Sequence, residues 1–116
     1  MSETDCLFCS IVAKKIPADI VHETATTLAF RDLQPQAPVH VLVIPTRHEP
    51  TAAALVETDR TVLADIVATA HDVAISEGLA ESGYRLVVNT GPDAQQSVFH
   101  AHVHVLGGRK MGWPPG

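Results

Sequence analysis

Three histidines alternate with small or β-branched apolar residues in the segment His100-Ala101-His102-Val103-His104-Val105-Leu106. Alternation with a period of two predicts a β-strand, with the three imidazoles on one face and the apolar side chains on the other. Adjacent imidazoles would lie about 7 Å apart and the outer two about 13 Å apart, because a strand advances roughly 3.3 Å per residue. One metal ion binds nitrogens at about 2.0–2.1 Å, so it could take a neighbouring pair but hardly all three. We therefore expect the three histidines to have different roles.

Composition restricts the class of protein. Of the 116 residues, 46% are hydrophobic and only 4% are aromatic, which predicts a single domain over residues 1–116 with an aliphatic core. The formal net charge of −5 argues against a nucleic-acid polymer as partner, although a small phosphorylated ligand remains allowed. No apolar run reaches membrane-spanning length, and the acidic start of the chain is unlike a signal peptide. We expect a cytoplasmic protein that does not bind a membrane.

Cys6 and Cys9 form a Cys-x-x-Cys motif within a predicted N-terminal helix in residues 1–15, with Thr4 or Asp5 as its N-cap. Positions i and i+3 of a helix are neighbours, so both sulfurs can face one point. A redox pair of the thioredoxin kind would normally follow a strand, and a reducing compartment disfavours a disulfide. Two interpretations stay open: half of a zinc site completed by histidines, or two buried free thiols.

The rest of the chain alternates strand patterns with one long helical pattern. Asp59 is a predicted N-cap and Gly78 a predicted C-terminal residue for a helix from Asp59 to Glu77. Short turns between neighbouring strands imply an antiparallel sheet, so the predicted class is α+β, with five antiparallel strands, one long helix and one short helix. Besides the histidine segment, the predicted strands are Ile20–Glu23, Thr27–Arg31, Val39–Pro45 and Tyr84–Asn89.

Several polar residues of this pattern have two interpretations. His40 lies inside a predicted buried strand, where it is either a satisfied core histidine or part of a site. Asp32 either forms the turn at the entrance of a proline-rich loop or accepts ligand hydroxyls. The loop that ends at Ser97 can offer N–H donors to an anion. The tail over residues 109–116 carries Trp113 and adjacent prolines, which favours docking on the body or on a second subunit.

At this point a family resemblance is plain. The segment His100–Leu106 resembles the signature of the histidine triad (HIT) family, in which His and apolar residues alternate before two further apolar residues. The upstream half of the chain also resembles this family, at Asp32, Gln34–Pro38, His40, Ile44–Pro45 and His48. A second set of residues resembles one branch of the family, the Hint branch: Asn89, Gln96–Ser97, Leu106–Arg109 and Trp113–Gly116. The resemblance covers almost the whole chain. It implies a homodimer with one continuous sheet and a nucleotidyl hydrolase of purine nucleoside 5′-phosphoramidates that requires no cofactor for its chemistry.

The resemblance also implies catalytic roles by position. His102 would be the nucleophile on the α-phosphorus, forming a nucleotidyl-histidine that water then hydrolyses. Ser97 would lie near the leaving amine, His104 would hold a phosphate oxygen, and His40 would lie behind the site and tune the protons. The attacking nitrogen of His102 must be unprotonated, so we expect its other nitrogen to donate to a backbone carbonyl. His100 would complete the triad unless a metal ion holds it.

Binding and metal roles follow in the same way. Asp32 would take the ribose hydroxyls, Asn89 would bind near the phosphate, and Trp113 would reach towards the partner's site. Gln96 would also belong to the substrate-binding residues. The wall around the base would consist of Leu7, Phe8, Phe30 and Leu33. Family members with a structural zinc hold it by residues that match Cys6, Cys9, His48 and His100. Gln95 stands where many Hint-like sequences have Gly, so it either distorts the loop or shows that a positive φ is not strictly required there.

Three other functions compete with this one. A dinucleoside polyphosphate hydrolase would have the same fold, and the Gly-Gly pair and Trp-Pro-Pro-Gly ending argue against it. A non-catalytic nucleotide-binding or interaction module would not depend on His102. A histidine-ligated metalloenzyme would lose turnover with a chelator, whereas transfer through a histidine would survive unless metal removal unfolds the protein.

Overall fold

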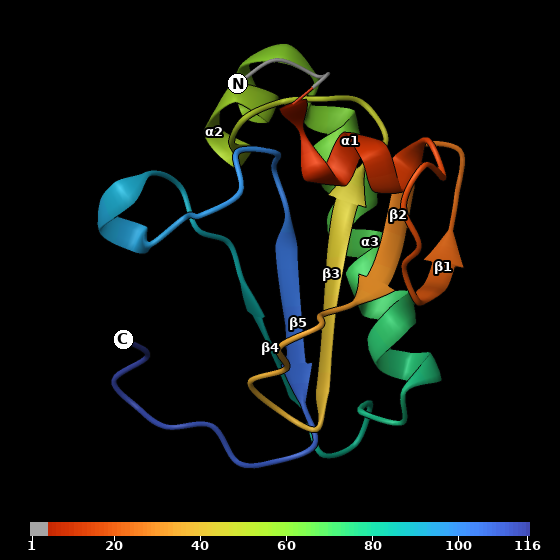
Figure 1. Ribbon diagram of the computed structural model, residues 1–116. Helices are drawn as coiled ribbons and strands as arrows, with labels where there is room; N and C mark the ends of the chain where they lie inside the picture. The colour runs from red at the N-terminus through yellow and green to blue at the C-terminus, as the bar shows by residue number, and fades with distance from the viewer. Residues whose placement is uncertain (1–4) are drawn as a thin grey trace.

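A five-stranded antiparallel sheet forms the centre of the molecule (Figure 1). The computed structural model describes residues 5–116, so the proposed cap Thr4 lies outside the described residues. The strand order is β1-β2-β3-β5-β4 and every neighbouring pair is antiparallel. The strands are β1 (Ile20–Glu23), β2 (Thr27–Arg31), β3 (Val39–Pro45), β4 (Tyr84–Val87) and β5 (Val103–Gly107). The predicted α+β class and antiparallel sheet are confirmed.

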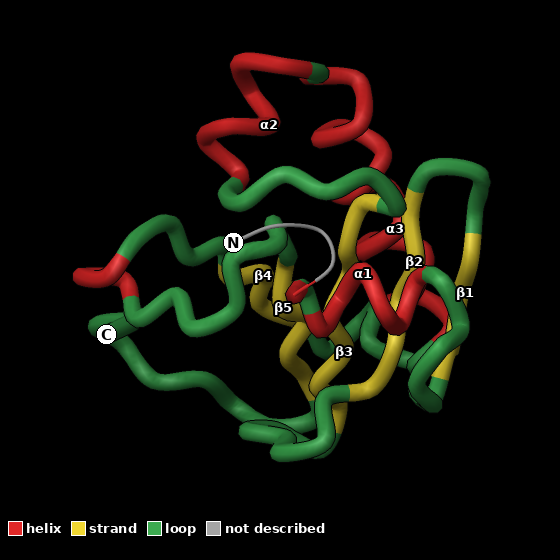
Figure 2. Tube along the Cα trace, turned by 45° about the horizontal axis from the view of Figure 1, so that its top comes forward, coloured by secondary structure: helices red, strands yellow, loops and turns green. Residues whose placement is uncertain are grey.

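The sheet lies between two apolar layers, one formed with α3 and the other with α1. Helix α3 (Arg60–Ser76) packs on one face, against Val41 and Val43 of β3, and α1 (Leu7–Val12) packs on the other, against Leu42 and Ile44 (Figures 1 and 2). Alternate side chains of a strand point to opposite faces, so β3 is covered on both sides. The α3 layer is a scaffold, whereas the α1 layer borders the histidines.

The helices differ from the prediction in number and in capping. Asp59 caps α3 as expected, its carboxylate accepting from Thr61 N and Val62 N. A third helix, α2 (Ala52–Thr58), precedes it and was not predicted; Thr51 caps α2, and the extended backbone of Asp59 ends it. Cys6, not Asp5, caps α1 through its sulfur. Within residues 5–116 no helix is long and apolar enough to cross a bilayer.

Two strands are shorter than the sequence pattern indicates. The β5 ladder begins at Val103, opposite Val43, so His100 and His102 precede the strand instead of lying within it. β4 ends at Val87 and not at Asn89. Alternation of apolar and polar residues predicts which side chains share a face, but it does not predict whether a neighbouring strand pairs with the segment.

The tail after β5 runs away from the sheet (Figure 1). Arg85 Nη2 donates to the Gly112 carbonyl at 2.9 Å, and the guanidinium lies 5.8 Å from the centre of the Trp113 ring. Trp113 nevertheless remains 82% exposed. Docking of this tail on a second subunit stays a prediction.

Among the glycines of the chain, Gly107 at the end of β5 is the one where an added Cβ would meet the nearest neighbour. A Cβ built there would lie 2.5 Å from Leu79 Cδ1, and Leu79 is buried. We expect Gly107→Ala to lower the free energy of unfolding by about 1–3 kcal/mol through overpacking. Gly112→Ala is the matched control, because nothing lies within 4 Å of its Cβ position. Urea denaturation of both variants measures this, and equal stabilities would contradict the packing argument.

Candidate active site

A pocket of about 440 Å³ opens on the α1 side of the sheet. It is bounded by α1, by the chain after β2 and by the loop before β5. Its lining residues are Leu7, Phe8, Ile11, Ile16, Pro17, Ala18, Phe30, Arg31, Asp32, Leu33, Gln34, Leu42, Ser97, Val98, His102 and His104. The fold thus places the four residues expected around the base beside Asp32, Ser97 and two of the three histidines.

His102 has a tautomer fixed by the backbone. Its Nδ1 lies 2.8 Å from the carbonyl oxygen of His100. A carbonyl only accepts hydrogen bonds, so Nδ1 carries the proton and Nε2 keeps an unshared electron pair. This confirms the expected carbonyl partner. The ring of Phe8 packs edge-on at a centroid distance of 5.3 Å and limits how the imidazole can turn.

His40 and His104 form a directed hydrogen-bond chain. His104 lies opposite Leu42 in the β3·β5 ladder, so His40 is its diagonal neighbour on the same face. The backbone N–H of Gln36 donates to His40 Nδ1 at 3.0 Å, which leaves the neutral ring's proton on Nε2. That Nε2 lies 2.9 Å from His104 Nδ1, which accepts and leaves the His104 proton on Nε2. His40 is therefore a satisfied core histidine and a link to the pocket.

Burial keeps these imidazoles neutral. It lowers the pKa of His40 and of His102, against the opposing charge of Asp32 and, for His102, the hydrogen bond to the His100 carbonyl. The pKa of His104 is lowered to about 4. The main cause is burial, and the like charges of His102 and His40 lower this pKa further. Neutral rings are what the directed hydrogen bonds require, so geometry and electrostatics agree.

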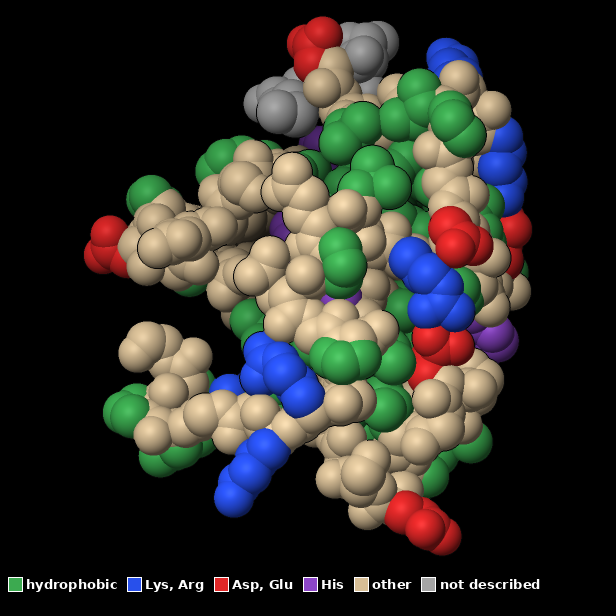
Figure 3. Space-filling model, turned by 60° about the horizontal axis from the view of Figure 1, so that its bottom comes forward, with side chains coloured by type: hydrophobic (Ala, Val, Ile, Leu, Met, Phe, Trp, Pro, Cys, Tyr) green, Lys and Arg blue, Asp and Glu red, His purple; other side chains and the backbone are tan. Residues whose placement is uncertain are grey.

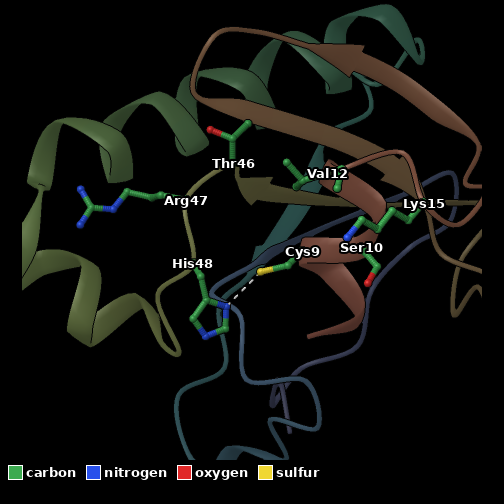
Figure 4. Close-up of a pocket in the computed structure, with 8 residues that line it drawn as sticks. Cys9, Ser10, Val12, Lys15, Thr46, Arg47 and His48 are labelled. Carbon is green, nitrogen blue, oxygen red and sulfur yellow. Dashed lines mark hydrogen bonds between the residues drawn. The ribbon is translucent and has the colours of Figure 1, made fainter. Parts of the chain in front are cut away.

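The third histidine of the segment belongs to a different cluster. His100 Nδ1 lies 3.3 Å from Cys6 Sγ, 3.5 Å from Cys9 Sγ and 3.3 Å from His48 Nδ1, and Cys9 Sγ lies 3.3 Å from His48 Nδ1. Figure 4 shows Cys9 and His48 pointing towards one another. His100 Nε2 donates to the Pro45 carbonyl at 2.9 Å, so its Nδ1 is free of a proton and suited to bind a metal.

The dimensions of this cluster fit a tetrahedral ion. The four ligand atoms all lie within 4.8 Å of one another. Zn–S bonds of about 2.3 Å and Zn–N bonds of about 2.0–2.1 Å give tetrahedron edges of roughly 3.3–3.8 Å. The observed separations of 3.3–3.5 Å match those edges. The donor set of two thiols and two imidazoles is one that zinc prefers.

Asp32 forms the predicted turn and also lines the pocket. Its Oδ1 accepts from Gln34 N at 2.8 Å, which closes the turn, and its Oδ2 lies 3.5 Å from His40 Nε2. Binding of ligand hydroxyls by this carboxylate stays a prediction.

Gln96, Asn89 and Trp113 were also expected to bind substrate, but none of them lines this pocket. The buried Gln96 amide braces its own loop: Oε1 accepts from Gly91 N at 3.0 Å, and Nε2 donates to the carbonyls of Pro50 and Val98. It thereby positions Ser97, the next residue.

Gln95 adopts the left-handed conformation, with φ 62° and ψ 36°. It ends the short 3₁₀ helix η2 (Pro92–Ala94) just before the loop segment that carries Ser97. The loop therefore does use a positive φ at the position where Gly is common in similar sequences. An ordinary side chain tolerates this at a cost of about 1–2 kcal/mol.

Some functional groups could not be found from the sequence. Val98 and Leu42 line the pocket but look like ordinary core residues in the pattern. The carbonyls of Pro45 and Glu49, which hold His100 and Ala101, carry no side-chain signal at all. On the face in Figure 3, histidine shows as small recessed areas near the middle and as a larger exposed group at the right edge.

The lowered pKa of His104 predicts a pH-dependent stability. Between pH 6.5, the ordinary histidine value, and about 4, the unfolded ring binds a proton that the folded ring does not. The stability that the neutral ring contributes is thus fully present above pH 6.5 and is lost as the pH falls towards 4. Urea midpoints in the presence of EDTA should fall less steeply over this range for His104→Asn than for the wild type. Equal slopes would contradict the assignment.

Comparison with known proteins agrees with this geometry. Residues 13–111 match the HIT domain family. An uncharacterised HIT-like protein of Synechococcus elongatus is 51% identical, with all of both chains covered. A protein of Brassica juncea described as a 14 kDa zinc-binding protein is 46% identical over 97% of this chain and 100% of that one.

A solved structure is similar as well. The HIT family hydrolase from Legionella pneumophila superposes with a TM-score of 0.93 at 49% identity, covering 97% of this chain and 100% of the other. The match spans the sheet, the pocket and the histidine segment. Sequence and fold together show that this chain is a member of the HIT domain family and has the fold of a HIT family hydrolase.

Proposed function

We propose that the protein is a nucleotidyl hydrolase that cleaves the P–N bond of purine nucleoside 5′-phosphoramidates through a nucleotidyl group on His102. The observation that carries the proposal is the hydrogen bond of His102 Nδ1 to the His100 carbonyl, at the floor of the pocket. It leaves a neutral imidazole with its electron pair on Nε2, which is the form that attacks phosphorus.

The reaction divides into two displacements. His102 Nε2 forms a bond to the α-phosphorus as the P–N bond breaks, and the amine leaves with a proton delivered from the solvent side, where Ser97 lies exposed at the pocket. Water then attacks the phosphorus, the P–Nε2 bond breaks, and the nucleoside monophosphate leaves with His102 restored. Each step replaces one bond to phosphorus by another, so no oxidant or cofactor enters the balance.

The remaining groups of the pocket support binding and charge. His104 Nε2–H, fixed by the chain from Gln36 through His40, is a donor for a phosphate oxygen. The Asp32 carboxylate accepts from ribose hydroxyls, and Phe8 and Phe30, whose rings pack edge-on at 5.4 Å, form the wall for a purine.

We also propose that Cys6, Cys9, His48 and His100 hold a structural zinc ion. The tetrahedral dimensions of the cluster support this, as does a relative that is described as zinc-binding. Bound there, the ion links α1 to the turn after β3 and to the segment before β5, and it supplies no reacting group to the pocket.

A homodimer with a continuous sheet is part of the same proposal. β4 is one of the two edge strands of the sheet, and Val88, just beyond it, is 47% exposed. The exposed Trp113 lies on the tail that contacts Arg85 of this strand. An unpaired edge beside exposed apolar groups favours pairing with a second copy.

Trapping the intermediate tests the enzyme directly. We expect rapid quench with a slow adenosine 5′-phosphoramidate to yield a nucleoside monophosphate adduct on His102 in a peptide mass spectrum. His102→Ala should lower kcat by at least about 10³-fold, because no other group supplies the covalent step. Turnover of a dinucleoside polyphosphate in preference to the phosphoramidate would favour the other hydrolase. Loss of turnover on chelation in a protein that stays folded would favour a metalloenzyme.

Metal analysis tests the zinc ion. We expect one zinc per chain in the purified wild type and less in Cys6→Ser and Cys9→Ser, with the melting temperature lowered by several degrees, since about 1 kcal/mol shifts it by roughly 4–8 °C in a domain of this size. Ser10→Ala is the control on the same helix, because Ser10 is not in the cluster. Wild-type protein that contains no metal by elemental analysis would refute the proposal.

A further inference from the structure

The segment that carries the nucleophile lies outside the sheet's hydrogen-bond ladder. β5 begins at Val103, which pairs with Val43, so the ladder ends before His102. A side chain that must face one phosphorus atom needs a fixed backbone. The fixing groups must therefore come from somewhere other than the strand.

One peptide unit supplies the orientation, and it is held on both sides. The carbonyl of His100 accepts from His102 Nδ1 at 2.8 Å, and the N–H of Ala101, in the same peptide plane, donates to the Glu49 carbonyl at 2.7 Å. Rotation of this plane would break both bonds together. The proton position on His102 is thus tied to the turn that follows β3.

The Cys/His cluster contacts both segments that hold this peptide: the segment of His100 and the turn of His48 and Glu49. His100 contributes its ring to the cluster and its carbonyl to His102. His48 contributes its ring to the same cluster and directly precedes Glu49, whose carbonyl holds Ala101. The Nδ1 atoms of His48 and His100 lie 3.3 Å apart. The two rings also pack edge-on at a centroid distance of 5.1 Å, and an ion bound between them would link each ring to the other by a metal–nitrogen bond.

We propose that the cluster of Cys6, Cys9, His48 and His100 positions the nucleophile, because the metal-bound rings of His48 and His100 fix the peptide whose carbonyl holds His102 in its Nδ1–H form. The proposal rests on the proposed function and adds a positioning role to the proposed structural zinc. His48 and His100 are positioning residues. When the ion is lost, the His100–Ala101 peptide turns more freely and His102 also populates the form with the proton on Nε2, which does not attack phosphorus.

A second route from the cluster to the pocket runs through α1 and has a different effect. Phe8 packs edge-on against both His100, at 5.9 Å, and His102, at 5.3 Å, and it lines the wall of the pocket. Loosening of α1 would therefore weaken nucleotide binding. His48 lies on the turn after β3 and not on α1, so its substitution separates the two routes.

The test compares zinc-loaded wild type with His48→Gln. Lys15→Gln is the matched control, because Lys15 lines the same surface pocket as Cys9 and His48 but is not in the cluster (Figure 4). His48→Cys is the rescue variant, since it restores a zinc ligand. Three quantities are measured: the ¹⁵N shifts of the His102 ring, the Kd for AMP, and the single-turnover rate of adduct formation from a slow adenosine phosphoramidate.

The expected result is a change in rate without a change in binding. Wild type and Lys15→Gln should show the Nδ1–H form of His102 alone, and His48→Gln a mixture of both forms. The single-turnover rate of His48→Gln should fall about 10–100-fold, as for other groups that orient a site from behind, with the Kd for AMP changed by less than about twofold. His48→Cys with zinc should recover both the ring form and the rate, and EDTA should abolish the recovery.

Two results would overturn the proposal. One is His102 remaining wholly in its Nδ1–H form with the rate unchanged in His48→Gln and in metal-stripped wild type. The other is a raised Kd with an unchanged rate, which would place the effect in α1. If His48→Gln does not fold, wild type stripped of metal and then reloaded gives the same comparison. If zinc-loaded wild type forms no adduct, the proposed function fails, while the ¹⁵N shifts still decide whether the cluster governs the His102 ring.

Discussion

The hydrogen bond between the His102 ring and the His100 carbonyl is the constraint on which the site depends. A carboxylate in the place of this carbonyl would favour the protonated ring, since opposite charges raise the pKa of histidine. A carbonyl fixes the ring without adding a full charge, and burial then lowers the pKa of His102. The result is a neutral imidazole that is oriented by its Nδ1–H and keeps an electron pair on Nε2. The proposed attack on phosphorus uses that state.

The sheet makes this possible by dividing its side chains between two environments. One face meets α3 with mostly aliphatic residues and the buried hydrogen-bonded pair Thr27 and Thr69, and the other face places the histidines near α1 and the adjoining loops. Those polar groups satisfy one another: His40 bonds with Gln36 and His104, and His100 with Pro45. Within the described part of the chain, no buried side-chain nitrogen or oxygen lacks a hydrogen-bond partner. A network of this kind is rigid because each imidazole has a single workable proton position.

Much of this arrangement could be predicted from the sequence, and the exceptions have physical reasons. β3 and the Asp59 cap follow from local patterns, because a buried strand and a capped helix are determined by nearby residues. α2 was missed because the predicted helix was started at Asp59, the residue that in the structure both ends α2 and caps α3. β5 begins at Val103, opposite Val43, although β3 continues to Pro45, and a pattern of side chains along one segment contains no information on where pairing stops.

The site was predictable in type but not in detail. The spacing of the histidines indicated that one metal ion would not bind all three, and their division between the pocket and the Cys/His cluster needed contacts between residues 91 and 94 positions apart. The sequence does not distinguish a polar loop residue that binds a substrate from one that, like Gln96, hydrogen-bonds to its own loop. Docking of Trp113 on a second chain stays a prediction.

The sulfur of Cys6 begins α1 by accepting the backbone N–H of Cys9, and it also belongs to the Cys/His cluster. These two roles, the helix cap and the cluster, restrict the residue at this position in different ways. In a relative without the Cys/His cluster, Ser, Thr, Asp or Asn could still start the helix at this position, whereas Ala in place of such a cap would cost about 0.5–2 kcal/mol. We therefore expect Cys6 to be replaced mainly by small polar residues. Cys at this position in a related sequence would indicate that the Cys/His cluster is retained, and Ser, Thr, Asp or Asn would indicate that only the helix cap is retained.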